Sequence, residues 1–413
     1  MKIINILTLI TAICLPDAAM AQTQEIWIAP GTNNTWDASA PSGSLSNPLN
    51  GGGSGLDNIL SSYWSANNLI IHLLPGNFTT VGEAGGNYYQ LKNGWHIIGA
   101  GIDKTVVTLT TNGGWAFTTW YASGISNVLV SDLTVDCNAE ISDSGSSSTI
   151  GGVFLTGENA TIERVRVINA DGGNGESFVL WVADGGNSSK HLLIRDCEVS
   201  SFYNPNGSGV CTAINISGAA YSSNNLASGI VEDNIVRLNR NGGEFAYGGW
   251  GMDGVLFRGN YSYNAARGFT DDTPIAKNMV VKDNFFYDSW MGACIVGCSN
   301  SVLENNTFIM SANCTGVIAC GNNSITSGAS EWVIRNNTFR AEDGATNAYS
   351  LNFAPTFSGG IAQPSPTDFI VENNKIDYSL HGYGLNTNCA YYFNNTTFQG
   401  HLPNGFPPSN VPP

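Results

Sequence analysis

The chain has 413 residues, only 12% of them charged, and its 32 Asp and Glu outnumber its 16 Lys and Arg, for a formal net charge of −16 at pH 7. Because nucleic-acid binding rests on clustered Lys and Arg facing phosphates, this composition argues against a nucleic-acid partner. It also disfavours a polyanionic substrate unless a cation bridges that substrate to the protein.

Residues 1–21 are an expected signal peptide. Lys2 supplies the positive start, an apolar run follows over residues 3–15, and Ala19-Met20-Ala21 fits a cleavage site before Gln22. No later apolar run reaches the length that a membrane-spanning helix needs. The sequence therefore predicts a secreted protein, extracellular or periplasmic, without a membrane span.

Residues 22–67 are expected to form a turn-rich segment that ends in a short amphipathic helix. Ser54 or Asp57 is available to cap that helix. Since the ends of a stacked-repeat protein expose its core, we expect the helix to cover the first repeat. Its apolar positions, at helical spacing, are Leu56, Ile59, Leu60 and Tyr63.

Residues 68–400 contain a short motif that recurs six times. Each copy is an apolar residue, a charged residue, a small residue and Asn, as in Val281-Lys282-Asp283-Asn284 and Ile334-Arg335-Asn336-Asn337. A recurring unit of 20 to 50 residues is typical of a solenoid, in which neighbouring units stack to build one core. The Asn residues of the six copies are Asn234, Asn260, Asn284, Asn306, Asn337 and Asn374.

The residues around each Asn favour strands. Runs such as Phe285-Phe286-Tyr287 and Thr307-Phe308-Ile309 are aromatic or β-branched and are bounded by Gly, Asn and Ser. Apolar residues do not recur at helical spacing, and the fixed Leu positions of leucine-rich repeats are missing. The pattern predicts an all-β protein made of coils of short parallel strands, with one Asn of each coil at a tight corner, where stacked amides can bond from coil to coil.

On these residues the chain resembles pectin-lyase-like proteins, which are single right-handed parallel β-helices. The resemblance covers roughly residues 68–400, which implies about nine or ten coils. Residues 401–413, rich in Pro, are expected to be an extended tail. In the resembled family the second strand of each coil lines a groove that binds polysaccharide.

Aligning the coils by a recurring Gly predicts where that second strand lies. Gly243, Gly268, Gly292 and Gly316 recur at nearly constant spacing. In this alignment the acids of two neighbouring coils converge, because adjacent strands are about 4.8 Å apart. Crowded carboxylates raise one another's pKa, which supplies the protonated acid and the ionised base of glycoside hydrolysis. The predicted catalytic residues are Glu244, Asp271 and Asp272, with Arg267 and Lys277 to orient a carboxylate or act as a base.

The resemblance leaves three functions open. Hydrolysis by the acids above is preferred and requires no cofactor, although the Asn-Thr-Asp and Gly-His-Gly motifs of polygalacturonase-like hydrolases are absent. A lyase would eliminate across a uronate, with Ca²⁺ held by Glu244, Asp271 and Asp272 and with Arg267 or Lys277 as the base. The third function is non-catalytic glycan binding by an extracellular solenoid, since a fold alone does not define an activity.

Other residues near the same coils are candidates for binding the polysaccharide, and the protein is expected to be a monomer. Aromatic rings offer flat faces to sugars, and a carboxylate can accept bonds from hydroxyl groups. Trp250, in a Gly-rich turn, is the strongest candidate for exposure. The predicted substrate-binding residues are Trp181, Tyr247, Trp250, Asp253 and Trp290.

Eight of the nine cysteines remain once Cys14 leaves with the signal peptide, an even number for an oxidising compartment. Their spacing suggests a disulfide between Cys197 and Cys211 and another between Cys298 and Cys320. No Cys and His spacing matches that of a zinc site.

Overall fold

The structure is a computed structural model of the whole chain, and it describes most of the repeat region. The signal peptide predicted for residues 1–21 and the tail predicted for residues 401–413 lie outside the described residues. The described residues are 23–31, 38–82, 91–111, 114–119, 125–138, 150–170, 177–183, 190–200, 211–218, 225–238, 244–271, 273, 275–320, 329–342, 345, 347–353, 366–377, 380 and 390–398.

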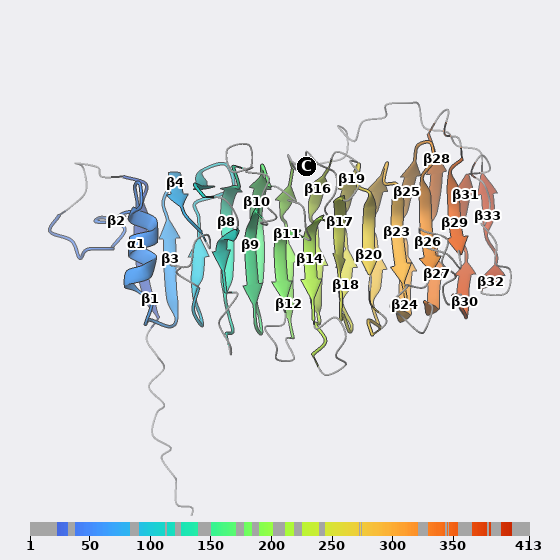
Figure 1. Cartoon of the computed structure of the whole chain (residues 1–413), viewed down its shortest axis with the longest axis horizontal. Coiled ribbons are helices and arrows are strands. Elements are labelled where there is room, and N and C mark those ends of the chain that lie inside the picture. The colour runs from blue at the N-terminus through green and yellow to red at the C-terminus, as the bar shows by residue number, and fades with distance from the viewer. Residues whose placement is uncertain are drawn as a thin grey trace, which may run out of the picture.

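The chain winds into a right-handed parallel β-helix, as the sequence predicts, and its strands lie side by side along the long axis of the molecule (Figure 1). One strand of each coil enters a nine-stranded parallel sheet. The strands of this sheet are β7 (Gly114–Thr118), β9 (Ile150–Thr156), β11 (Ser177–Ala183), β14 (Cys211–Ser217), β17 (Glu244–Gly249), β20 (Arg267–Asp271), β23 (Met291–Val296), β26 (Thr315–Cys320) and β29 (Tyr349–Phe353).

The other strands of the coils form a 24-stranded sheet that bends at the Asn corners. These strands are β1 (Gln24–Ala29), β2 (Leu49–Asn50), β3 (Leu69–Leu73), β4 (Gly76–Thr80), β5 (His96–Ile98), β6 (Thr105–Leu109), β8 (Leu129–Asp136), β10 (Thr161–Ile168), β12 (Leu192–Arg195), β13 (Glu198–Val199), β15 (Gly229–Glu232), β16 (Ile235–Arg237), β18 (Leu256–Arg258), β19 (Tyr261–Tyr263), β21 (Val280–Lys282), β22 (Phe285–Tyr287), β24 (Ser299–Glu304), β25 (Thr307–Met310), β27 (Ser330–Arg335), β28 (Thr338–Ala341), β30 (Phe369–Glu372), β31 (Lys375–Asp377), β32 (Ala390–Phe393) and β33 (Thr396–Phe398).

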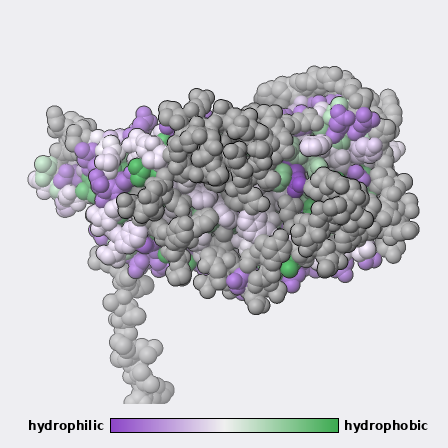
Figure 2. All heavy atoms as spheres, viewed as in Figure 1, coloured by the Kyte–Doolittle hydropathy of each residue, from purple (hydrophilic) through white to green (hydrophobic). Residues whose placement is uncertain are grey.

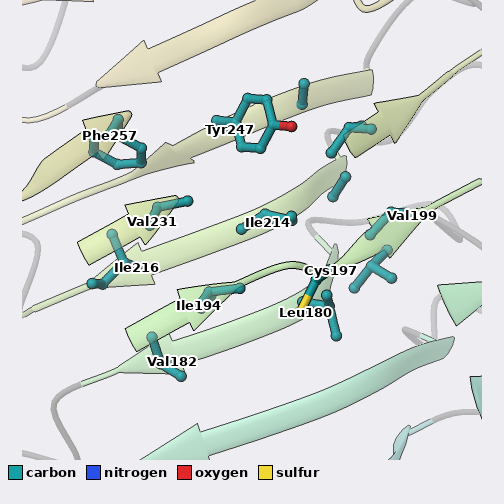
Figure 3. Close-up of a cluster of buried hydrophobic side chains, with 14 of the residues drawn as sticks. Leu180, Val182, Ile194, Cys197, Val199, Ile214, Ile216, Val231, Tyr247 and Phe257 are labelled. Carbon is teal, nitrogen blue, oxygen red and sulfur yellow. The ribbon is translucent and has the colours of Figure 1, made fainter. Parts of the chain in front are cut away.

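The hydrophobic core lies between the two sheets. Leu180 and Val182 of β11 and Ile194 of β12 belong to one cluster of buried side chains (Figure 3). Alternate residues of each strand face this core, since side chains alternate across a strand. On the face shown in Figure 2, the coloured hydrophobic residues occur singly among hydrophilic and intermediate ones. Because each sheet turns one face to the core, the outer faces of the two sheets point away from each other.

The N-terminal end differs from the prediction at one boundary. β1 pairs in parallel with β3, so the sheet begins at Gln24 and not at residue 68. The predicted helix is present as α1 (Gly55–Ser62), and Leu56 and Leu60 are fully buried. Neither predicted cap forms, because the Ser54 side chain makes no capping bond and the Asp57 carboxylate accepts bonds from β4 and the residue after it.

The repeated Asn residues stack from coil to coil. Asn306 Nδ2 donates to Asn337 Oδ1 at 3.0 Å, and Asn284 Nδ2 donates in turn to Asn306 Oδ1 at 2.9 Å. The same bonds join the other copies, and Asn395 adds a member that the sequence analysis missed. The left-handed backbone expected at these Asn residues lies one residue earlier, for example at Asp283, where φ is 56°.

The cysteines do not form the predicted disulfides in this structure. Cys197 and Cys298 are buried free thiols. The Cys197 side chain points into the core, where its sulfur lies 3.7 Å from the Ile162 carbonyl oxygen (Figure 3). Burial raises the pKa of Cys197 to about 12 and raises that of Cys298 strongly, so both stay protonated near neutral pH.

Replacing Gly292 with alanine is expected to lower the free energy of unfolding by about 2 kcal/mol, the cost of overpacking a core. A Cβ atom at this position would overlap the Phe308 ring and lie 2.6 Å from the Gly316 carbonyl oxygen. Urea denaturation of the variant measures the change. Gly31→Ala is the control, because a Cβ atom there meets nothing within 4 Å. Equal stability of the two variants would contradict the close packing of these coils.

Candidate functional site

The outer face of the nine-stranded sheet is built from one row of residues, which we call the outer row. Each member pairs with the next across adjacent strands, and the flanking Leu180 and Val182 belong to the core, so the row faces outward. Aromatic and polar residues fill its N-terminal half, and its C-terminal half holds two apolar residues, Cys294 and Ile318, between Thr270 and Asn352. The outer row runs Thr118, Phe154, Trp181, Asn215, Gly248, Thr270, Cys294, Ile318 and Asn352.

Four aromatic side chains gather on the N-terminal half of this face, and we call them the aromatic cluster: Trp115, Phe154, Trp181 and Trp250. The rings of Phe154 and Trp181 are stacked with centroids 4.1 Å apart, and Trp115 lies 5.1 Å from Phe154. Trp250 meets Trp181 edge-on at 5.7 Å. Trp115 and Phe154 are buried, whereas Trp181 and Trp250 are partly exposed. The cluster thus has a buried base and an open end.

Polar side chains hold the open end of the aromatic cluster in place. Trp181 Nε1 donates to Ser217 Oγ at 3.2 Å, and Ser217 Oγ donates to Asn215 Oδ1. Asn215 and Ser217 are almost fully buried. The next position of the outer row is Gly248, so no side chain stands between Asn215 and Thr270. These contacts fix the Trp181 ring, and at Gly248 the Thr270 side chain packs so closely that an added Cβ atom would lie 2.7 Å from its Cγ2.

Asp271 does not lie on the outer face. Asp271 pairs with Ile295 of the next coil, and Ile295 pairs with Ala319 of the coil after that; both partners are core residues. The exposed fraction of Asp271 is 0%. Phe269 faces the core, and a period of two therefore turns Asp271 inward as well. Its carboxylate lies close to Cys298. Burial is the main cause of the raised pKa of that thiol, and the Asp271 carboxylate raises it further. A catalytic acid must reach solvent and substrate, so this position does not fit the predicted role.

The predicted convergence of Glu244 with Asp271 is wrong, because the alignment by Gly slips in this coil. Gly268, Gly292 and Gly316 align as expected, but Ala246 and not Gly243 stands at the position equivalent to Gly268. Glu244 begins β17, whereas Asp271 ends β20 at the level of Gly249. Five residues of strand, about 17 Å, separate the two levels. The side chain of Glu244 and the whole of Asp272 lie outside the described residues.

The two predicted basic residues lie apart from each other. The Arg267 guanidinium covers the Phe245 ring, 4.3 Å from its centroid, and Arg267 Nη1 donates to Thr270 Oγ1 at 3.1 Å. Lys277 lies on the other sheet, where its ammonium is 3.8 Å from Asp253 Oδ2 in an exposed ion pair. Of the two, Arg267 is the one on the outer face of the nine-stranded sheet.

Two predicted sugar-binding residues lie outside the aromatic cluster. Tyr247 is a core residue, 2% exposed, and its hydroxyl lies within 2.9 Å of the carbonyl oxygens of Asn234 and Tyr261. Burial raises the pKa of this hydroxyl strongly. Trp290 is 48% exposed but precedes β23, at the opposite edge of the sheet from Trp250, which follows β17. The Tyr247 side chain therefore faces away from the cluster, and Trp290 lies at the other edge of the sheet.

The sequence analysis missed Trp115 and Phe154. Both lie in strands upstream of the first repeated Asn, where no spacing fixed the register. The available signal was an aromatic residue at the same strand position of two successive coils, since Phe154 pairs with Trp181, whereas Trp115 lies three residues before Thr118, the partner of Phe154.

The described residues contain no group of three or more His, Cys, Asp or Glu that could hold a metal ion. Within the same part of the chain, no helix is long and apolar enough to cross a membrane.

No protein-family model matches the chain, and no curated protein matches it. Several solved structures share its fold. The A-module of the mannuronan C-5 epimerase AlgE6 from Azotobacter vinelandii has a TM-score of 0.55 and 13% identity, covering 84% of this chain and 95% of its own. PfbA, a surface adhesin of Streptococcus pneumoniae, has a TM-score of 0.56 and 12% identity over 84% of this chain and 87% of its own.

A third similar structure is a hyperthermoactive exopolygalacturonase from Thermotoga maritima, with a TM-score of 0.51 and 12% identity over 79% of this chain and 84% of its own. At such low identity these likenesses establish architecture and not activity. The chain therefore has the right-handed parallel β-helix fold of pectin-lyase-like proteins.

Proposed function

We propose that this protein binds a polysaccharide on the outer face of its nine-stranded sheet, with Trp181 and Trp250 as the surface on which sugar rings stack. The observation that carries the proposal is the aromatic cluster, in which two partly exposed Trp rings lie 5.7 Å apart on an otherwise regular sheet. Flat apolar rings with a polar handle suit the CH-rich faces of sugars and the hydroxyl groups at their edges.

The surroundings of the aromatic cluster support a sugar ligand. Asn215 and Ser217 lie buried next to the Trp181 ring and hold it in place, which preorganises the ring for stacking on a sugar. Because the net charge is −16, we infer a neutral polysaccharide, or an acidic one that a cation bridges.

The activities of the structural neighbours fit this proposal. One neighbour is an epimerase of mannuronan and another is an exopolygalacturonase, so two proteins of this fold act on polysaccharides. A third is a surface adhesin. With the predicted signal peptide, these neighbours support a protein that is exported and acts outside the cytoplasm.

Cleavage of the bound polysaccharide is the second candidate function. The observation that favours it is the Arg267 guanidinium on the same outer face, one coil beyond Glu244, which lies at the start of β17. In this proposal Glu244 is one of the two carboxylates of hydrolysis and Arg267 orients it. Asp271 is omitted because it is buried, and its neighbour Asp272 because the level of Asp271 already lies about 17 Å from that of Glu244, whereas the carboxylates of glycoside hydrolases lie about 5 to 9.5 Å apart. A lyase would need Ca²⁺ at Glu244, with Arg267 as the base.

Incubating the mature protein with a panel of soluble polysaccharides, with and without a chelator, tests both functions. We expect slowed migration of the protein in gels that contain the bound polysaccharide. New reducing ends without an unsaturated chromophore indicate hydrolysis, and a chelator-sensitive chromophore indicates elimination. Absence of binding to every neutral and acidic polysaccharide of the panel would overturn the proposed function. Glu244→Gln should abolish any cleavage, whereas Asp271→Asn should alter stability first.

A further inference from the structure

A surface groove of about 390 Å³ crosses the 24-stranded sheet on the side that faces away from the aromatic cluster. Its floor is a row of outward residues in which Leu129, Thr161 and Leu193 pair from strand to strand. The short Thr161 side chain stands between two leucines, and the sheet surface is therefore hollow at Thr161. The two leucine strands are about 9.6 Å apart, which sets the width of the groove.

Polar groups close both ends of this groove. At one end Asn159 Nδ2 donates to Asn127 Oδ1 at 3.0 Å. At the other end Glu163 Oε2 accepts from Arg195 Nε at 2.7 Å. Four residues of strand separate Asn159 from Glu163, so the ends are about 13 Å apart. An apolar floor with donors and acceptors at its ends is the arrangement that small-molecule sites share, and 390 Å³ lies within their usual range of about 300 to 1,000 Å³.

The charges that line the groove cancel. Burial raises the pKa of Glu163, but its bonds to Arg164 and Arg195 outweigh burial and lower the pKa overall, so this carboxylate stays ionised. It neutralises the Arg195 guanidinium that faces the groove. Burial lowers the pKa of His96, the remaining titratable lining residue, which keeps its ring neutral at pH 7. An anion gains little here, because the guanidinium already has its partner.

We propose that this groove is a second carbohydrate site, which binds a neutral oligosaccharide across Thr161 with its hydroxyl groups bonded to Asn159 at one end and to Glu163 and Arg195 at the other. This inference rests on the proposed function, since it assigns a second contact to the same polysaccharide class. Two sites on opposite faces let one molecule hold two chains or two parts of one chain, which raises the overall avidity.

The test uses calorimetric titration of the mature protein with neutral hexasaccharides of β-1,4-glucan, β-1,3-glucan and β-1,4-mannan, and with hexagalacturonate as the acidic comparison. Thr161→Leu fills the hollow at Thr161 with the same side chain that Leu129 and Leu193 carry at the neighbouring positions. Val280→Leu is the matched control, because Val280 occupies the same outward row several coils away. The wild type is expected to bind a neutral hexasaccharide at two sites per chain.

Thr161→Leu should abolish one of the two binding events or weaken it at least about tenfold, while Trp181→Ala removes the other and Val280→Leu keeps both. Two unchanged events in Thr161→Leu overturn the groove and leave the proposed function standing. If the wild type shows only one binding event and Trp181→Ala loses it, the groove is likewise overturned and the proposed function stands. Preference of the groove for hexagalacturonate overturns its neutral specificity, and no binding of any hexasaccharide overturns the proposed function together with the groove.

Discussion

Trp181→Ala will weaken polysaccharide binding about thirtyfold, a loss of about 2 kcal/mol that is typical of a central aromatic contact residue. Trp181 is the ring that connects the cluster, because it stacks on Phe154 at 4.1 Å and meets Trp250 at 5.7 Å. Its removal takes away one stacking surface and leaves the other without support. Affinity electrophoresis against the best polysaccharide of the panel measures the change.

Two further variants separate stacking from other effects. Trp181→Phe keeps an aromatic face but loses the bond from Nε1 to Ser217, so we expect an intermediate loss of affinity. Trp290→Ala removes a Trp that is 48% exposed at the other edge of the sheet and should bind like the wild type. If Trp290→Ala lost as much affinity as Trp181→Ala, the aromatic cluster would not be the binding surface.

Asn306→Ala will lower the free energy of unfolding by about 3 kcal/mol or more, since each buried polar group left unpaired costs about 1 to 3 kcal/mol. Asn306 is 1% exposed, and its Oδ1 accepts from the backbone N–H and the side-chain amide of Asn284. Its Nδ2 donates to the Val281 carbonyl oxygen and to Asn337 Oδ1. Truncation leaves all four groups buried without this partner.

Urea denaturation of Asn306→Ala and Thr307→Val measures that cost. Thr307 is the next residue along the chain, only partly buried, and its change to Val keeps a β-branched side chain in β25, so we expect less than about 0.5 kcal/mol from it. Equal midpoints for the two variants would show that the Asn bonds contribute little to the stability of the solenoid.

The fold could be predicted because each coil of a solenoid carries the same sequence motif. Six Asn residues at similar spacing specify the corner of each coil, and β-branched runs after them specify strands. The first coil was misassigned because β1 lies far from any Asn of the motif, although the alternation in Glu25-Ile26-Trp27-Ile28 is the pattern of a half-buried strand. At β1 the local alternation of apolar residues therefore predicts a strand, although the repeated motif is absent from that part of the chain.

The site was harder to predict, because a shift of one residue in the alignment of a strand moves each side chain to the other face of the sheet. Gly243 resembles Gly268 in sequence, yet Ala246 takes the equivalent position, which moves Glu244 to the start of the strand. The sequence predicted Asp271 and Asp272 as a pair of catalytic acids. Phe269 faces the core, however, and Asp271, two residues later on the same strand, faces the core as well. Trp181 and Trp250 were predicted separately as sugar-binding residues, and the structure brings their rings within 5.7 Å because β11 and β17 are two strands apart in the sheet.

A crystal structure of the mature protein with its best-binding oligosaccharide tests the central proposal most directly. The account predicts a sugar ring stacked on Trp181, in van der Waals contact at about 4 Å, with a second contact to Trp250. Sugar bound elsewhere, with both Trp rings uncovered at saturating ligand, would contradict it.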